Sequence, residues 1–285
     1  MIDIRRSWTF AALLSLLVSL VVSAVASAAH AGEPSAGDAA AALAEAYPDF
    51  ITVDDQHQPR WRDGTPLPLG AARSFDAVPK ALADASVLEQ FHYVYPLGPW
   101  DPKVLPEEDP GRLRNTAFFT RMYGDCHRRG GVQKSLRTVV WLPKTAPQRL
   151  QVTTINGIDR QVEQLSAEIE ALPPVARSAA TQLAGGFACR NIAGTSLPSM
   201  HAYGAAMDLK SAVGRYWQWS GLSPASRKVN LVPQQLIDLF EKHGFIWGGK
   251  WYHYDTMHFE YRPELLLYAK RRATAPDHIL EDHPL

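Results

Sequence analysis

Residues 199–208 read SMHAYGAAMD and place His201 seven positions before Asp208. On one straight strand these two side chains would face opposite sides, because side chains alternate along a strand. The chain must therefore turn between them if they act together. Gly204 lies where it can supply that turn, since glycine adopts left-handed backbone conformations at no steric cost.

Residues 247–260 read WGGKWYHYDTMHFE and form the second informative stretch. Asp255 and His258 are three positions apart, so a bend or bulge is needed for them to converge. His258 and Glu260 are two apart and share a face if the chain is extended there. Glu260 therefore competes with Asp255 as a base or as a ligand, and a final strand is expected near residues 258–261.

Histidine and carboxylate side chains are common ligands of a catalytic zinc ion, which takes three protein ligands and leaves a fourth position open for water. The metal lowers the pKa of that water to about 7, and a second carboxylate nearby can accept its proton. The chain has 10 histidines, however, so some pairing with aspartate is expected by accident. Spacing alone leaves open a structural envelope protein in which these histidines only pack.

The chain around these stretches has a mixed pattern of strands and helices from about residue 113 onward. Apolar side chains at Ile158, Val162, Leu165 and Ile169 recur at helical spacing. The expected elements are strands at 135–142 and 149–155, and helices from 158 to Pro173, at 175–183 and from Pro233 to Gly244. Because these elements do not alternate regularly, we predict an α+β domain with a small antiparallel sheet flanked by helices over residues 113–272.

The first part of the chain differs in composition. Residues 32–46 are rich in alanine and are predicted to be a flexible start. Residues 47–112 are rich in proline and aromatic residues, which indicates an irregular N-terminal lobe with one short helix around 78–91. Residues 273–285 are expected to form a polar tail.

Residues 1–31 have the layout of a secretory signal peptide. Arg5 and Arg6 precede an apolar run at 10–25, and small-x-small patterns at 26–28 and 29–31 suit cleavage. We therefore expect an exported protein, periplasmic or extracellular. The alternative is an uncleaved anchor, in which case the chain would also contact the membrane.

Export bears on the two cysteines, Cys126 and Cys189. A disulfide between them is favoured over two separate buried thiols, because exposed free thiols are uncommon outside the cytoplasm.

The net charge of the chain limits the kinds of partner it can bind. Lys plus Arg and Asp plus Glu each number 29, and zero net charge argues against nucleic acid, whose binding needs a basic excess.

The two stretches together resemble a known family. Ser-x-His-x-x-Gly-x-Ala-x-Asp, followed by Trp-Gly-Gly-x-Trp and Asp-x-x-His-Phe-Glu, is similar to the zinc D-Ala-D-Ala carboxypeptidase family, which includes VanY-like and VanX-like enzymes and the L-alanyl-D-glutamate endolysins. The resemblance covers about residues 113–268. The aspartate before x-x-His is closer to the endolysin branch. The resemblance implies a hedgehog/DD-peptidase-like fold and a metallopeptidase that takes peptidoglycan stem peptides as substrates.

The resemblance also implies roles by position. His201, Asp208 and His258 match the Zn²⁺ ligands, and Asp255 matches the catalytic base. Arg190 lies upstream of the first motif, where the family often has an arginine that polarises the scissile carbonyl.

Other residues of the two motifs have supporting roles. Ser199 is expected to be a hydrogen-bond partner rather than a nucleophile, because no base is placed to activate it. Trp247 and Trp251 are expected to pack in the core or to line the cleft. The alternative function is a non-catalytic zinc-containing module that binds the cell wall.

Overall fold

The structure is a computed structural model and describes residues 33–73, 84–103, 106, 108–210, 212, 214–219 and 230–274. The expected signal peptide at 1–31 and all but the first two residues of the expected tail lie outside the described residues. Of the helix expected at 78–91, residues 78–83 also lie outside, and only Leu88–Phe91 forms a short 3-10 helix. No helix in the described part of the chain is long and apolar enough to cross a membrane.

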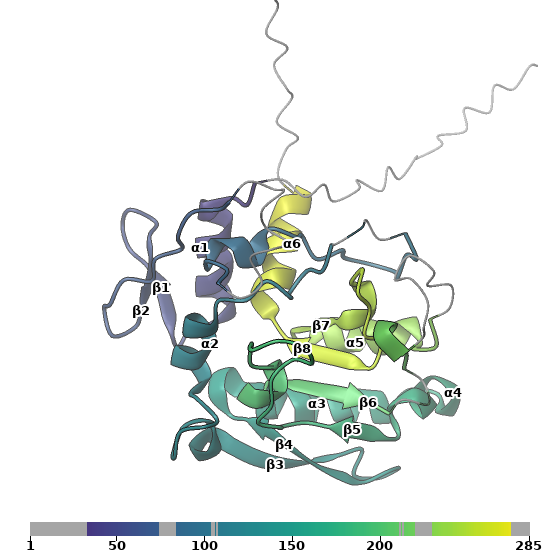
Figure 1. The fold of residues 1–285 in the computed structure, drawn as a ribbon. Helices are drawn as coiled ribbons and strands as arrows, with labels where there is room; N and C mark the ends of the chain where they lie inside the picture. The colour runs from purple at the N-terminus through teal and green to yellow at the C-terminus, as the bar shows by residue number, and fades with distance from the viewer. Residues whose placement is uncertain are drawn as a thin grey trace, which may run out of the picture.

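The described strands form small antiparallel sheets, as predicted for the α+β class. A four-stranded sheet has the order β5-β6-β8-β7, and two hairpins lie outside it (Figure 1). The four strands of the sheet are β5 (Leu183–Gly185), β6 (Ala206–Leu209), β7 (Phe245–Trp247) and β8 (His258–Tyr261). The hairpins pair β1 (Ile51–Val53) with β2 (Pro59–Trp61), and β3 (Leu136–Trp141) with β4 (Gln148–Thr153). The three strands expected from the sequence are β3, β4 and β8.

Two of the described helices in the second half of the chain, α3 (Ile158–Glu170) and α5 (Gln234–Lys242), follow the sequence pattern. Helix α3 buries the predicted stripe and packs against β3 and β4. Helix α5 begins directly after Pro233 and packs against β7. Two shorter helices are α2 (Thr116–Tyr123) and α4 (Pro174–Arg177).

The prediction of a flexible start at 32–46 is wrong for most of that range, because Ala36–Ala46 form helix α1. Alanine has the highest intrinsic helix propensity. The hydroxyl of Ser35 accepts a hydrogen bond from the Asp38 backbone N–H and caps the first turn. The apolar face of α1 is fully buried, so tertiary packing fixes a segment whose composition suggested mobility.

The partner of α1 is helix α6 (Pro263–Thr274), which was not predicted. The two helices lie side by side in Figure 1, and the backbone N–H of Ser35 donates to the Tyr268 hydroxyl at 3.0 Å. Pro263 occupies the first turn, where its missing N–H has no helical partner to lose. The beginning and the end of the described chain are therefore joined.

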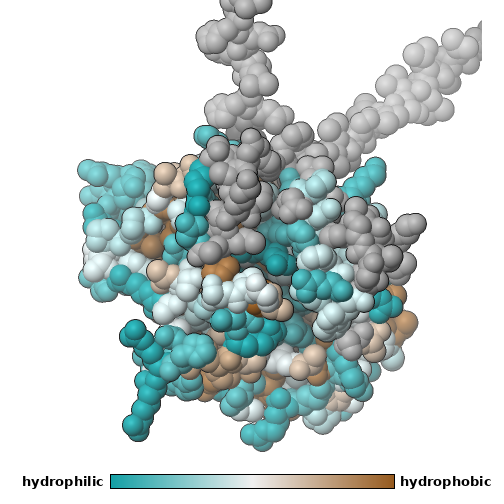
Figure 2. Space-filling view, viewed as in Figure 1, coloured by the Kyte–Doolittle hydropathy of each residue, from teal (hydrophilic) through white to brown (hydrophobic). Residues whose placement is uncertain are grey.

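The N-terminal lobe shares one continuous hydrophobic core with the rest of the described chain. Lys250, within the second motif, is buried and donates hydrogen bonds to the carbonyl oxygens of Pro96 and Gly98 and to Glu241. The lobe is thereby fixed to the sheet region. Figure 2 shows one face of the molecule with hydrophilic residues interrupted by small hydrophobic patches.

Candidate metal centre

Strands β6 and β8 bring the two motifs together. Asp208 pairs with His258 in the strand register, and Ala206 pairs with Glu260. His201 lies in a short 3-10 helix, Met200–Tyr203, that precedes β6. Gly204 follows this helix with φ 68° in the left-handed region, so the turn predicted between His201 and Asp208 is confirmed.

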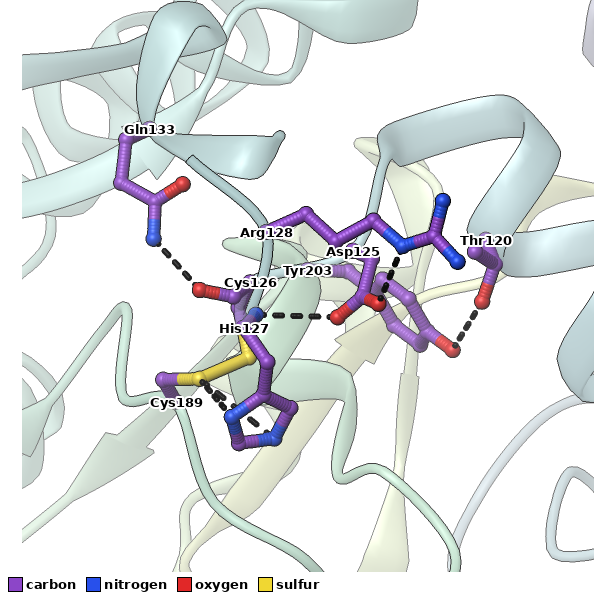
Figure 3. Close-up of a disulfide and its surroundings, with 8 residues drawn as sticks. All are labelled: Thr120, Asp125, Cys126, His127, Arg128, Gln133, Cys189 and Tyr203. Atoms are coloured by element: carbon purple, nitrogen blue, oxygen red, sulfur yellow. Dashed lines mark hydrogen bonds and ion pairs between the residues drawn. A yellow bond between two sulfur atoms is a disulfide. The ribbon is translucent and has the colours of Figure 1, made fainter. Parts of the chain in front are cut away.

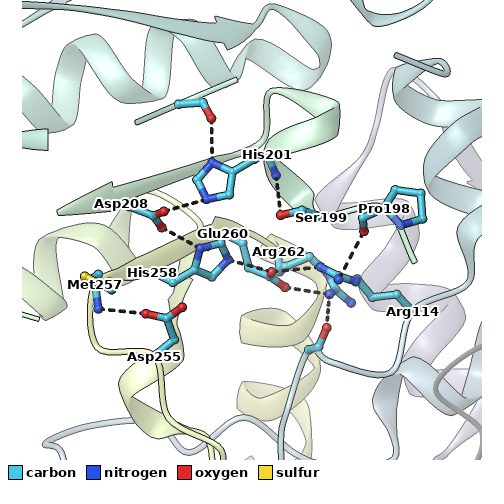
Figure 4. Close-up of polar contacts among 12 residues, drawn as sticks. Arg114, Pro198, Ser199, His201, Asp208, Asp255, Met257, His258, Glu260 and Arg262 are labelled. Atoms are coloured by element: carbon cyan, nitrogen blue, oxygen red, sulfur yellow. Dashed lines mark hydrogen bonds and ion pairs between the residues drawn. The ribbon is translucent and has the colours of Figure 1, made fainter. Parts of the chain in front are cut away.

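The Asp208 carboxylate lies between the two histidine rings (Figure 4). Its Oδ2 is 3.1 Å from His201 Nε2, and its Oδ1 is 2.9 Å from His258 Nδ1. Both imidazoles are buried, and their ring centroids are 5.1 Å apart. One ligand atom from each of the three residues lies within 4.8 Å of the other two.

The remaining nitrogen of each ring has its own acceptor. His201 Nδ1 lies 2.6 Å from the Gly186 carbonyl oxygen and donates its proton there. His258 Nε2 lies 3.2 Å from Glu260 Oε2. In the neutral state of both rings, these contacts leave the lone pairs of His201 Nε2 and His258 Nδ1 directed at Asp208.

The residues present fit a divalent metal ion. Two imidazole nitrogens and a carboxylate oxygen match the donor set of a three-ligand site. His201 Nε2 is buried and has no hydrogen-bond partner of regular geometry, although Asp208 Oδ2 is within ion-pair distance. A buried nitrogen of this kind is costly unless a partner satisfies it, and a cation would do so.

When no cation is bound, the contacts within the cluster favour an ionised Asp208 and a protonated His258. Burial opposes ionisation of Asp208, but its contacts with His201 and His258 hold the pKa of Asp208 well below its ordinary value. Burial likewise opposes charging of His258, yet Asp208 and Glu260 raise the pKa of His258 to about 10. In the metal-free protein, the proton of the imidazolium occupies the position that a cation would take.

Asp255 lies in the turn that leads into β8, and its Oδ1 accepts a hydrogen bond from the Met257 backbone N–H. Its carboxylate is drawn beside His258 in Figure 4. Burial raises the pKa of Asp255, the nearby His258 lowers it and the charge of Asp208 raises it, for a net increase. A carboxyl group with a raised pKa is a better proton acceptor and donor near neutral pH.

Arg190 is exposed, and no hydrogen bond or ion pair among the described residues joins its guanidinium to the three ligand candidates. Its backbone carbonyl accepts from the Ser199 N–H at 3.0 Å, which places it beside the first motif. Burial raises the pKa of Tyr216 overall, while the positive charges of Arg112 and, to a smaller extent, Arg190 lower it. Tyr216 is in turn the backbone partner of Asp255.

Two ambiguous residues of the motifs now have defined partners. The Ser199 hydroxyl accepts a hydrogen bond from the His201 N–H at 3.3 Å and caps the short helix. Glu260 meets the nitrogen of His258 that faces away from Asp208, so it is a partner of a ligand candidate rather than a fourth member of the cluster. Trp247 is fully buried, and the ring of Trp251 packs 5.7 Å from that of His258.

The buried charges behind the cluster were not predicted from the sequence. Glu260 forms ion pairs with Arg114 and Arg262, and Arg262 also pairs with Glu264. Glu264 then accepts a 2.6 Å hydrogen bond from the Tyr47 hydroxyl of the N-terminal lobe. The only signal in the sequence was the alternation of charges at 260, 262 and 264, which on a strand that continues straight would share one face.

The predicted disulfide between Cys126 and Cys189 is confirmed, with Cα atoms 5.7 Å apart (Figure 3). His127 lies next to it, with Nδ1 3.5 Å from the Cys189 sulfur. Cys126, His127 and Cys189 form a second group of potential metal ligands that lie close together. Because the two sulfur atoms are bonded to each other, these cysteines cannot bind a metal as thiolates. The bridge fixes the segment that contains Arg190 to the loop after α2.

Comparison with known proteins agrees with the motifs. Residues 193–261 match the family model described as D-alanyl-D-alanine carboxypeptidase. This segment contains His201, Asp208, Asp255 and His258, so the family recognised from the two motifs is confirmed over it. The match shows similarity to this family over that segment, which is about a quarter of the chain. Comparison with curated proteins and with solved structures finds no significant match.

Proposed function

We propose that this chain is an exported zinc-dependent peptidase that hydrolyses amide bonds in peptidoglycan stem peptides. The bond is of the D-Ala-D-Ala carboxypeptidase type or of the L-Ala-D-Glu endopeptidase type. The observation that carries the proposal is the convergence of His201, Asp208 and His258, with ligand atoms within 4.8 Å of one another. The description of the matched family supports the substrate class.

The proposed chemistry needs a metal, a base and a charge that stabilises the oxyanion. When bound, zinc supplies a Lewis acid that polarises the scissile carbonyl and makes water more acidic. Asp255 takes a proton from the attacking water as the new C–O bond forms. When the C–N bond breaks, Asp255 returns that proton to the leaving amine.

Arg190 completes the proposed site. Arg190 is exposed and its backbone lies beside the first motif, and we propose that its guanidinium approaches the carbonyl oxygen of a bound peptide from there. Preorganised positive charge on a developing oxyanion contributes about 3 kcal/mol to catalysis in other enzymes. The confirmed disulfide next to Arg190 supports both a fixed backbone at this position and an oxidising compartment, periplasmic or extracellular.

Digestion of purified peptidoglycan sacculi, with and without a chelator, tests the proposal. We expect soluble fragments that disappear with chelator and return with added zinc, and their masses identify the bond. Free D-alanine would indicate carboxypeptidase activity, whereas cleavage after the first L-alanine would indicate the endopeptidase. Binding to sacculi without released fragments would instead support a zinc-containing cell-wall-binding module. A purified protein that holds no zinc and ignores the chelator would contradict both.

A further inference from the structure

Arg114 contacts both segments that supply the ligand candidates. Its NH1 group lies 3.2 Å from Glu260 Oε2, and its NH2 group donates to the Pro198 carbonyl oxygen at 3.4 Å (Figure 4). Pro198 is three residues before His201, and Glu260 is two residues after His258. One buried guanidinium therefore bridges two stretches that are about sixty residues apart in the chain.

The backbone around Arg114 is fixed against the same strand. The Gly111 carbonyl oxygen accepts a hydrogen bond from Arg262 NH1 at 2.9 Å. Gly111 has φ 101°, and an added Cβ would lie 2.6 Å from Ile246 Cδ1 and 3.2 Å from Glu260 Oε1. This close approach leaves the segment little freedom to move away from β8.

Glu260 links Arg114 to the metal centre. Its Oε2 atom is shared by Arg114 NH1 and His258 Nε2, while its Oε1 atom pairs with Arg262. The carboxylate is almost fully buried, so water does not replace a lost partner easily. Loss of the Arg114 contact would leave Oε2 held only by the histidine that it is meant to orient.

We propose that Arg114 is a positioning residue that clamps the two ligand segments and, through Glu260, orients the His258 ring toward Asp208. The inference rests on the proposed function only in that the site holds zinc. Arg114 lies outside the matched segment 193–261, so the metal centre is completed by a part of the chain that the family match does not include.

The test measures zinc affinity by competition with a chromophoric chelator, in a cycle of four proteins: wild type, Arg114→Gln, Glu260→Gln and the double variant. Loss of a partner that orients a metal ligand typically weakens metal binding 10- to 100-fold. We expect a loss of that size for Arg114→Gln. Because part of the effect of Arg114 passes through Glu260 and part through Pro198, the loss in the double variant should be smaller than the product of the two single losses.

Four outcomes separate failure of the inference from failure of the proposed function. An Arg114→Gln protein with wild-type zinc affinity would overturn it, and so would losses that simply multiply in the double variant. Wild-type protein that binds no zinc would contradict the proposed function itself, which distinguishes the two failures. A positive cycle with no hydrolysis of sacculi would support the clamp and leave the non-catalytic module as the function.

Two further variants control for folding. Arg121→Gln removes an arginine that is paired with Asp63 on the surface, and it should leave zinc affinity unchanged. Thermal unfolding in chelator shows whether Arg114→Gln is folded. If it is not, Arg114→Lys retains the charge at Glu260 but cannot bridge to Pro198 at the same time, and an affinity equal to wild type would then overturn the inference.

Discussion

Asp208 and His258 face each other across β6 and β8, with Oδ1 of the aspartate 2.9 Å from Nδ1 of the histidine. In the metal-free protein the contact is a salt bridge, because the pKa of His258 is raised to about 10. The same nitrogen is the one that faces the proposed ion. Metal and proton therefore compete for a single position.

Zinc binding should release about one proton from His258 at pH values between its ordinary pKa of 6.5 and the raised value of about 10. Because protonated His258 must lose its proton to bind metal, apparent zinc affinity should rise about tenfold per pH unit in this range. Titration calorimetry in two buffers of different ionisation enthalpy measures the proton. Binding heats that are equal in both buffers would contradict the prediction.

Substitution of Asp255 should separate metal binding from turnover. Asp255→Asn removes the base but none of the three ligand candidates, so we expect wild-type zinc affinity and a kcat lower by about 100- to 10,000-fold. Asp54→Asn, on the β1–β2 hairpin, is a matched surface control. An Asp255→Asn protein that hydrolyses sacculi normally would remove this residue from the mechanism.

The disulfide should contribute to stability without contributing to zinc binding. Cys126 and Cys189 are separated by 63 residues, and a cross-link of that span stabilises by about 4 kcal/mol in the chain-entropy model. Replacing both cysteines by alanine should therefore lower the melting temperature by roughly 10 °C, given the usual size scaling. Calorimetric scans measure this. An unchanged melting temperature would show that the bridge adds no net stability.

Gly111→Ala should be destabilising for two separable reasons. The substitution forces a side chain into the left-handed region and into Ile246, for a combined cost of about 2 to 4 kcal/mol. Gly64 has φ 85° but no atom near its missing Cβ, so Gly64→Ala carries the backbone cost alone. Urea unfolding of both variants gives the difference. Equal losses would mean that the packing around Gly111 adjusts without penalty.

The cluster of His201, Asp208 and His258 was predictable because these residues lie in two recognisable motifs. The His201 to Asp208 spacing required a turn, and Gly204 supplies it. The apolar stripe of α3 could also be predicted from the sequence, because apolar residues at helical spacing indicate one buried helix face. Each of the two motifs, at 199–208 and 247–260, and the stripe of α3 at 158–169 is a local pattern that can be read from one short stretch of sequence.

The rest of the site depends on contacts between distant parts of the chain. Arg114 and Glu260 are 146 positions apart, and nothing near either residue indicates that the two charges are buried together. The prediction of a flexible segment in place of helix α1 was wrong for a similar reason. The alanine-rich composition of this segment fits both a mobile linker and a packed helix, and only the presence of α6 decides between them.

The packing of α1 against α6 has a consequence for the folding of the chain during its synthesis. Ser35 and Tyr268 are 233 positions apart, so the first helix lacks α6, against which it packs, until almost the whole described chain has left the ribosome. Folding of this protein must therefore finish late, after helix α6 has emerged, and the face of α1 that packs on α6 remains open to chaperones until then.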